Sequence, residues 1–412
     1  MEWCNVPPMQ DAGPADDARR FWTLDPSVRF LNHGSFGACP APVLEEQTRL
    51  RERMERQPVQ FLARDLEGLL DAARAELARF LGADARDLVF VPNATTGVNT
   101  ILRSLRLSPA DEILATDHTY RACRNAVDFA AAWGGASVAV AQVPFPLDSS
   151  ERVVEAVLER VTPRTRLAVL DHVTSETGLV LPTERLVREL AARGIDTLVD
   201  GAHAAGMLPL DLTRIDAAYY TGNCHKWLCA PKGAAFLHVR RDRQSSVRPV
   251  VISHGATSPR TDRSRYELEF AWTGTLDPTA ALCVPAAIRF LGRLFPGGFD
   301  ELRRRNRERA LGARDLLCSA LGIEAPAPDE MIGSLVAVPL PPSASDAGRS
   351  IFDLDPLQRE LYERYRIETP VFPWPAPPRR TLRVSAQAYN RDEEYEALGD
   401  ALRRLLAPGT SA

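Results

Sequence analysis

The two lysines of this chain, Lys226 and Lys232, lie in one short segment, residues 224–232. All the other cationic residues among its 50 Lys plus Arg are arginines. A guanidinium stays protonated, so arginine cannot act as an amine nucleophile, whereas lysine can. A lysine retained against this bias is typical of a site that forms a Schiff base with a carbonyl cofactor. For Lys232 alone, chance survival is the simpler interpretation, but the residues around Lys226 favour the chemical one.

An acidic residue lies upstream of Lys226, with one further strand expected between the two. Asp200 ends an apolar segment and is followed by Gly201-Ala202-His203. A carboxylate at a strand end can point into a cleft and keep a pyridine nitrogen protonated, and a protonated ring is an electron sink that stabilises a carbanion. A helix N-cap is the ordinary alternative for such an Asp. Strand-end Asp followed by a post-strand lysine is nevertheless the order that a pyridoxal phosphate (PLP) site needs.

Two further segments offer groups for a phosphate. Residues 92–97, Pro-Asn-Ala-Thr-Thr-Gly, follow a strand and open a helix, whose free amides and hydroxyls form an anion site. Ordinary capping by threonine is the alternative there. Residues 222–225, Gly-Asn-Cys-His, supply small and polar groups directly before Lys226.

Two single residues complete the candidate chemistry. Tyr120 follows the strand that ends near Asp117, and its ring could lie flat against a cofactor; a tyrosine of the core or rim is the alternative. Arg383 lies in a strand-like segment, where a rigidly held guanidinium could clamp a substrate carboxylate through two parallel hydrogen bonds. A surface arginine is the alternative for Arg383.

Short apolar segments alternate with helical patterns in the middle of the chain. After a helical pattern at 65–81, the expected strands are 88–91, 112–115, 137–140, 167–170, 197–200, 217–220 and 235–237, with helices at 121–133, 151–161 and 183–193 between several of them. This alternation predicts an α/β fold with a mostly parallel seven-stranded sheet flanked by helices. In such sheets, binding sites gather at the carboxyl ends of the strands.

The chain is long enough for two domains. We expect an N-terminal arm at 1–29, a large PLP-binding domain at 30–290 and a smaller α+β C-terminal domain at 291–412.

Several finer features accompany this division. A helix at 278–294 leads out of the large domain, strands are expected at 335–338 and 381–384, and the Pro-rich stretches 339–342 and 370–378 predict loops.

Composition excludes several classes of function. A net charge of −4 and a pI near 6.1 indicate no basic face for nucleic acid. No apolar run of membrane-spanning length and no signal peptide are evident, so we expect neither membrane binding nor secretion. The seven cysteines are scattered without the spacing of a metal site. Reduced thiols in a cytoplasmic enzyme without a metal are the simplest account.

These segments together resemble a known family. The chain is similar to the class V aminotransferase superfamily of fold-type I PLP enzymes, and within it to the isopenicillin N epimerase-like branch. The similar segments occur in family order and are Phe30–Gly37, Asn93–Gly97, Asp117–Tyr120, Asp171–Ser175, Asp200–His203, Asn223–Trp227, Trp272–Thr275 and Leu382–Ala386.

The resemblance implies a role for each matching residue. Lys226 would form the Schiff base with PLP, Asp200 would pair with the pyridine nitrogen, and His203 and Ser175 would lie near the ring hydroxyl. Tyr120 would stack on the ring, with His118 as a less favoured candidate. Arg383 would bind the substrate carboxylate, with Asn32 and His33 near the substrate. The phosphate would be held by Ala94, Thr95, Asn223 and His225, and by Gly274 and Thr275 of a second subunit, which implies a homodimer with shared active sites.

One departure from related enzymes concerns sulfur chemistry. Cysteine desulfurases carry a persulfide-forming cysteine shortly before the carboxylate arginine, whereas residues 367–383 of this chain contain no cysteine. A persulfide mechanism is therefore not expected.

The expected function is chemistry at the Cα of an amino acid or peptide-like acid, through a Schiff base with the substrate amine and a Cα carbanion. Epimerase-like and C–S or β-eliminating lyase reactions come first, because they fit the branch. A decarboxylating or C–C bond-forming enzyme, an aminotransferase, and a non-catalytic PLP-binding sensor or scaffold are the alternatives.

Overall fold

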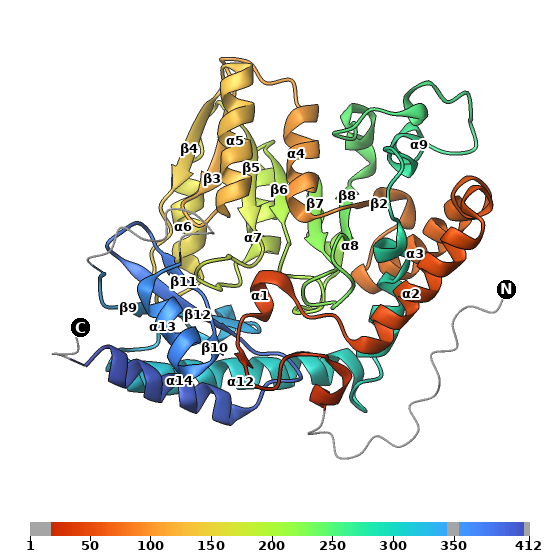
Figure 1. Cartoon of the computed structure of the whole chain (residues 1–412). Coiled ribbons are helices and arrows are strands. Elements are labelled where there is room, and N and C mark those ends of the chain that lie inside the picture. The colour runs from red at the N-terminus through yellow and green to blue at the C-terminus, as the bar shows by residue number, and fades with distance from the viewer. Residues whose placement is uncertain (1–17, 344–353, 408–412) are drawn as a thin grey trace.

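A computed structural model describes residues 18–343 and 354–407 of the chain (Figure 1). The first 17 residues of the expected N-terminal arm lie outside the described residues. The rest of the arm packs on the main body: Trp22 is buried against Phe290 and Tyr389.

The large sheet has seven strands in the order β2-β8-β7-β6-β5-β3-β4. Strands β3 to β7 run parallel, whereas β8 is antiparallel to both of its neighbours. The expectation of a mostly parallel seven-stranded sheet is confirmed. The strands are β2 (Leu88–Val91), β3 (Glu112–Thr116), β4 (Ser137–Ala141), β5 (Thr165–Asp171), β6 (Asp196–Asp200), β7 (Tyr219–Asn223) and β8 (Ala235–Val239).

The strand expected at 217–220 instead spans Tyr219–Asn223. Asp216 ends a short helix in the left-handed conformation, with φ of 51°. The chain must leave that turn before it can pair with β6, so the ladder starts later than the apolar pattern indicates.

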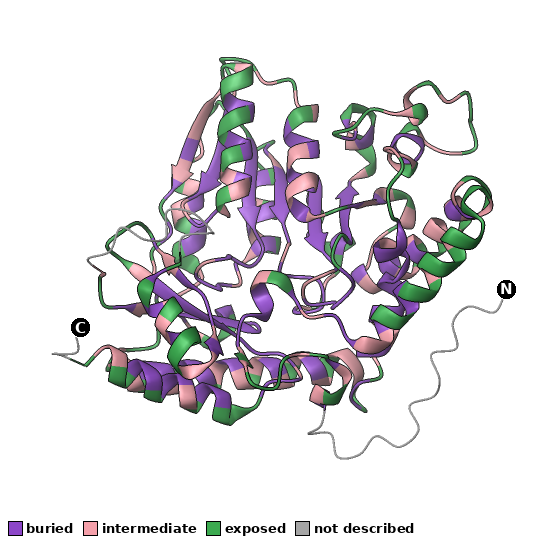
Figure 2. Ribbon diagram, in the orientation of Figure 1, coloured by how far each residue is buried: buried purple, intermediate pink, exposed green. Residues whose placement is uncertain are grey.

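Alternate side chains of each strand face different helices. Leu198 packs in a cluster with helices α4 and α5, whereas its neighbour Val199 packs on the opposite face. Figure 1 shows α4 and α5 side by side on one face of the sheet, and Figure 2 shows that the strands are buried while the outer helix surfaces are exposed. The helices of this part are α1 (His33–Phe36), α2 (Ala41–Arg56), α3 (Leu66–Leu81), α4 (Ala94–Ser104), α5 (Arg121–Gly134), α6 (Glu151–Glu159), α7 (Thr183–Ala191), α8 (Leu212–Ile215) and α9 (Arg265–Ala271).

The helix expected at 278–294 is two helices, α10 (Thr279–Leu282) and α11 (Val284–Leu291). Pro285 lies in the first turn of α11. Because proline has no amide N–H and its ring clashes with the carbonyl four residues earlier, the helix cannot run through this point. The proposed domain division after residue 290 falls at the last residue of α11, which ends at Leu291.

The C-terminal part contains a three-stranded antiparallel sheet in the order β11-β12-β9. Two Pro-rich stretches that were expected to be loops contribute to it: Pro339 and Leu340 end β9, and Val371–Pro373 forms β11. Both are edge strands, where a missing proline N–H leaves no inner ladder bond broken. The elements are α12 (Gly298–Leu321), β9 (Leu335–Leu340), α13 (Pro356–Tyr365), β10 (Ile367–Glu368), β11, β12 (Arg380–Ser385) and α14 (Asp392–Leu405).

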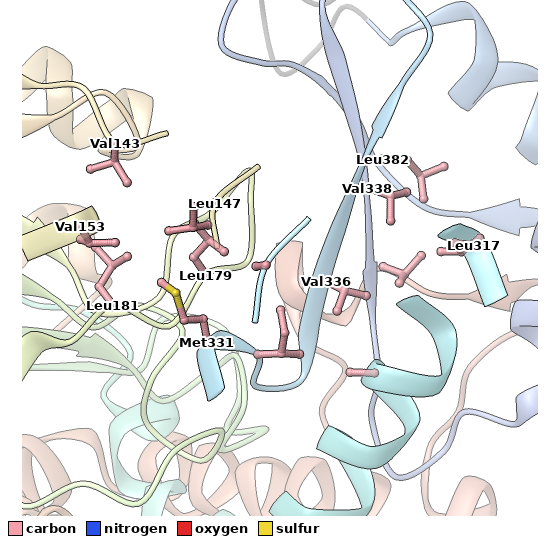
Figure 3. Close-up of a cluster of buried hydrophobic side chains, with 14 of the residues drawn as sticks. Val143, Leu147, Val153, Leu179, Leu181, Leu317, Met331, Val336, Val338 and Leu382 are labelled. Carbon is pink, nitrogen blue, oxygen red and sulfur yellow. The ribbon is translucent and has the colours of Figure 1, made fainter. Parts of the chain in front are cut away.

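One hydrophobic cluster joins the two parts of the chain (Figure 3). Leu179 and Leu181, which follow β5, lie in the same buried cluster as Met331, Val336 and Leu382 of the C-terminal part. The backbone N–H of Val180 donates to the carbonyl of Met331 at 2.8 Å. A second junction is the parallel pairing of β1 (Arg29–Phe30) with β10. These two contacts hold β12 beside the carboxyl ends of the large sheet.

Candidate active site

Lys226 lies just after β7, at the edge where the inner parallel strands end. Its Nζ atom is 3.1 Å from Nε2 of His203, which follows β6. Burial lowers the pKa of Lys226 to about 8, and the positive charge of Arg383 acts in the same direction, while Asp200 opposes the shift. About a tenth of this lysine is therefore a neutral amine at pH 7, far more than for an ordinary lysine, and the neutral amine is the nucleophilic form. Lys232 differs, because its Nζ donates to the carbonyl of Gly37 at 2.5 Å.

Asp200 is buried at the end of β6, and both of its carboxylate oxygens accept hydrogen bonds. Oδ1 accepts from the amide of Ala202 at 3.0 Å, and Oδ2 accepts from the thiol of Cys123 at 3.0 Å. Burial raises the pKa of Cys123 well above its usual value, so the sulfur keeps its proton and remains a donor. Cys123 was not among the predicted site residues, and nothing in its local sequence marks it.

A second buried carboxyl lies beside Asp200. Asp171 is its register partner on β5, and Oδ2 of Asp171 has no hydrogen-bond partner among the described residues. Burial, and then the charge of Asp200, raise the pKa of Asp171 well above its usual value. Burial thus favours the neutral, protonated form of Asp171 beside Asp200.

Arg383 projects from β12 and is almost fully buried. Its Nη1 donates to the carbonyl of Ser175 at 2.6 Å, and its Nη2 donates to Oγ of Ser35 at 2.8 Å. A longer contact joins Nη2 to Oδ1 of Asn32 at 3.4 Å. Burial lowers the pKa of Arg383 to about 10.

The hydrogen bonds of Arg383 do not pair its charge with a carboxylate, although Glu176 acts on it electrostatically. Its Nε has no hydrogen-bond partner, and within residues 18–343 and 354–407 the guanidinium forms no ion pair. A buried cation that lacks an anion is costly, so this arrangement favours a ligand carboxylate.

His33 supports the loop that carries Lys226. It is fully buried, its Nε2 lies 3.0 Å from the carbonyl of Lys226, and its Nδ1 lies 2.8 Å from the hydroxyl of Tyr389. Burial lowers the pKa of His33 to about 3, so the ring is neutral. Helix α1, which begins at His33, lies between the large sheet and β12 in Figure 1.

The residues expected at the phosphate come together at the start of α4. Oδ1 of Asn223 accepts from the amide of Ala94 at 2.8 Å, and the side chain of Asn93 caps the helix through the amide of Thr96. Nδ1 of His225 lies 2.9 Å from the carbonyl of Ala234 and must donate to it. The half-buried Thr95 lies between these groups in the first turn.

The structure separates the two aromatic candidates for the cofactor ring. Both ring nitrogens of His118 are engaged, with Oγ1 of Thr177 at 2.7 Å and the carbonyl of Val143 at 3.0 Å, and its ring packs on Trp374. Tyr120 is the residue directly before α5 and is half-buried. Burial raises the pKa of Tyr120, so its hydroxyl stays protonated.

Gly274 and Thr275 do not join the other candidates. They lie in the segment between α9 and α10, where Thr275 is exposed. Gly274 has a φ of 122°, and a side chain there would meet no neighbour within 4 Å. In the part of the chain that the structure describes, no hydrogen bond links either residue to the Lys226 site.

A further acidic residue lies at the site without having been predicted. Glu176 follows Ser175, whose carbonyl holds Arg383. Burial raises the pKa of Glu176, while Arg383, Arg121 and Lys226 act in the opposite direction. The amino-acid sequence marks Glu176 only weakly, because nothing but its place beside Ser175 distinguishes it from other acidic residues in loops.

These groups fit PLP on structural grounds. The site offers an amine with a lowered pKa, a buried carboxylate at a strand end, a capped helix N-terminus and an arginine that lacks an anion. PLP would supply an aldehyde for the amine, a pyridine nitrogen for the carboxylate and a phosphate for the helix N-terminus. The substrate carboxylate would pair with the arginine.

Comparison with known proteins agrees with this assignment. A family model described as aminotransferase class-V matches residues 39–351. The chain is 39% identical over 403 residues to isopenicillin N epimerase of Amycolatopsis lactamdurans, covering 94% of this chain and 98% of that protein. It is 33% identical over 422 residues to putative L-cysteine desulfhydrase 2 of Oryza sativa subsp. japonica, covering 93% of this chain and 86% of that protein.

Solved structures show the same fold. The cysteine desulfurase CsdA from Escherichia coli superposes with a TM-score of 0.77 at 22% identity, covering 96% of this chain and 99% of that chain. A mutant of C-DES with glycine covalently linked to its PLP cofactor superposes with a TM-score of 0.77 at 23% identity, covering 93% of this chain and 98% of that chain.

Proposed function

The chain belongs to the class-V aminotransferase family, and from this premise we propose that it acts at the Cα of an amino acid or peptide-like acid, as an epimerase or a C–S lyase. It is a PLP-dependent enzyme. The observation that carries the proposal is the placement of Lys226 in the combined field of Asp200 and of the buried Arg383.

The proposed roles of the residues derive from their contacts. When bound, PLP supplies an electron sink for the negative charge left at Cα after a proton departs. Arg383 binds the substrate carboxylate through its guanidinium. Lys226 would hold the resting cofactor covalently, and its free Nζ would accept the Cα proton of the bound substrate. Asp200 would hold a proton on the pyridine nitrogen of the bound cofactor.

The proposed cofactor cradle uses the remaining candidates. Tyr120 would cover the cofactor ring, because His118 already packs against Trp374. His203 would lie near the ring hydroxyl. The contacts of Ser175 and Asn32 with Arg383 support a role for these two residues in orienting the guanidinium.

The proposed phosphate site consists of Ala94, Thr95, Asn223 and His225. His225 donates through Nδ1 to Ala234, so its Nε2 can donate to a phosphate only when the ring is protonated. A bound phosphate would favour that protonation.

Epimerisation and elimination share the loss of the Cα proton and differ in the next step. An epimerase returns a proton to the opposite face. Glu176 and Tyr120, whose pKa values are raised by burial, are the candidates we propose for that step. A C–S lyase expels a sulfur leaving group from the side chain, which needs no second acid at Cα.

One experiment separates these outcomes. The purified holoenzyme is incubated in deuterated water with L-amino acids and small peptides, with and without sulfur in the side chain. An epimerase incorporates deuterium at Cα with inversion, whereas a lyase releases sulfide or a thiol together with a keto acid. Transamination products, loss of CO₂, or a cofactor spectrum unchanged by every substrate would instead support the aminotransferase, the decarboxylase or the non-catalytic alternative.

We further propose a homodimer in which Gly274 and Thr275 reach the phosphate site of the second subunit. The exposure of Thr275, Phe36 and Leu276 supports a surface that another copy can cover. Sedimentation and a Thr275→Ala variant test this arrangement: a monomer that retains full turnover would contradict it.

No helix in the described ranges is long and apolar enough to cross a membrane. A cytoplasmic location is proposed from the six free cysteines among the described residues.

A further inference from the structure

Trp227, the residue after Lys226, contacts the same histidine as the lysine does. Its indole Nε1 lies 3.3 Å from Nδ1 of His203, and both side chains are buried. On the other side of the imidazole ring, Nε2 lies 3.1 Å from Nζ of Lys226. Trp227, His203 and Lys226 therefore form a chain of two hydrogen bonds through one imidazole.

The direction of the first hydrogen bond is determined by chemistry. An indole N–H can donate but cannot accept, so Nδ1 of His203 must be the acceptor and must carry no proton. His203 is neutral, because burial lowers its pKa well below the usual value and the charge of Lys226 adds to that effect. A neutral imidazole carries one proton, which must then be on Nε2.

The direction of the second hydrogen bond depends on the first. With its proton on Nε2, His203 donates toward Lys226, and Nζ can accept only as a neutral amine. An ammonium group has no lone pair, so a charged Lys226 would place two donors against each other at 3.1 Å. The chain of hydrogen bonds therefore disfavours the charged form of Lys226.

We propose that Trp227 is a positioning residue that holds His203 in the Nε2–H tautomer and thereby keeps Lys226 as the free amine that captures PLP. This inference rests on the proposed function of Lys226 and adds the physical device behind its nucleophilicity.

Other charged groups also act on Lys226 and His203. Arg383 from β12 favours neutral Lys226, whereas Asp200 from β6, Cys123 from α5 and Glu176 after β5 oppose it. His33 from α1 acts on His203. The indole N–H donates to His203 and to none of these other groups, so its removal acts first on the tautomer of His203.

The first test uses Trp227→Phe, which removes the indole N–H and keeps an aromatic side chain. In full-length protein freed of cofactor, the rate of covalent PLP capture is followed by absorbance against pH. Wild type should show a titration near pH 8. In Trp227→Phe, His203 can expose an unprotonated Nε2 to the ammonium, so the apparent pKa should rise by roughly one unit.

Two controls show whether the effect passes through His203. Trp22→Phe removes another buried indole N–H, which donates to the carbonyl of Ala38 at 3.1 Å rather than to His203, and should leave the capture pKa unchanged. In a His203→Leu background, the further change Trp227→Phe should shift nothing. An unchanged pKa in the single Trp227→Phe variant, or an equal shift in the His203→Leu background, overturns the proposal.

A second measurement does not depend on any variant at Trp227. Selective ¹⁵N labelling of the seven histidines, with the signals of His203 assigned by their loss in His203→Leu, reports which ring nitrogen carries the proton. A protonated Nε2 with an unprotonated Nδ1 supports the proposal even if Trp227→Phe does not fold, and the opposite tautomer overturns it. A cofactor attached to Lys232 would contradict the proposed function but would leave this measurement of the tautomer valid.

Discussion

The thiol of Cys123 donates to Oδ2 of Asp200 across 3.0 Å, although the two residues are 77 positions apart in the chain. The contact joins the first turn of α5 to the end of β6 and fills one side of the buried carboxylate. Because burial raises the pKa of this thiol, it keeps its proton and remains a donor to Asp200.

The contact predicts graded effects of two substitutions. Asp200→Ala should retain part of its PLP but lose most turnover, because a contact of a carboxylate with the ring nitrogen contributes roughly 1.5–3 kcal/mol and an unprotonated ring is a poor electron sink. Cys123→Ala should lower kcat by only about tenfold, since it removes one weak donor. Steady-state kinetics and cofactor content measure both. Equal losses in the two variants would show that Cys123 does more than orient Asp200.

Lys226 rather than Lys232 should carry the cofactor. The nitrogen of Lys226 faces His203 inside the site, whereas that of Lys232 is bound to the backbone of Gly37. Borohydride reduction followed by peptide mass mapping should place the pyridoxyl adduct on Lys226. Lys232→Arg is the matched control and should keep the adduct, while an adduct on Lys232 would refute the site assignment.

Arg383→Lys should retain bound PLP but lose a factor of about ten to one hundred in kcat/KM. Lysine cannot copy the planar fork of the guanidinium, and a charged hydrogen bond contributes roughly 1.5–3 kcal/mol, at ~1.4 kcal/mol for each tenfold change. Steady-state kinetics on the best substrate measure the loss. An unchanged kcat/KM would place the carboxylate clamp elsewhere and would admit simple amines as substrates.

Gly97→Ala should weaken PLP binding and stability. A Cβ at this position would overlap Oγ1 of Thr221 and lie 2.8 Å from its Cβ, so α4 would have to move off β7 and take the phosphate site with it. Gly312→Ala in α12 is the matched control, because a Cβ there meets nothing within 4 Å and should stabilise the helix by about 0.5–1 kcal/mol. Thermal melting and the PLP dissociation constant separate the two. Wild-type affinity in Gly97→Ala would show that the helix start tolerates displacement.

Acid should destabilise the protein through its buried histidines. The folded pKa of His33 is about 3, below the ordinary value of 6.5, so the unfolded chain binds a proton that the folded chain does not over that interval. The contribution of His33 to the free energy of unfolding is therefore complete above about pH 6.5 and decreases as the pH falls toward 3. His33→Gln, which removes this titrating ring, should flatten the dependence of Tm on pH. A slope as steep as that of wild type would show that His33 does not contribute to it.

The sequence alone determined the alternation of elements and the residues with intrinsic chemistry. Apolar segments of strand length between helical patterns predicted the parallel sheet, and the strand ends then marked Asp200 and the region of Lys226. These inferences succeed because hydrophobic periodicity and residue type are local properties. The same local patterns failed at Pro285 and in the edge strands β9 and β11, where the position of a proline relative to its neighbours decides the outcome.

Only the tertiary structure decided which side chains meet. The thiol of Cys123 on Asp200, the indole of Trp227 on His203 and the carbonyl of Ser175 on Arg383 all join segments that are distant in sequence. Such contacts depend on how α5 and β12 pack against the sheet and on the direction of each side chain. A hydrogen bond forms only over about 3 Å and within a narrow angle, so no local pattern of residues can specify it before the chain is packed.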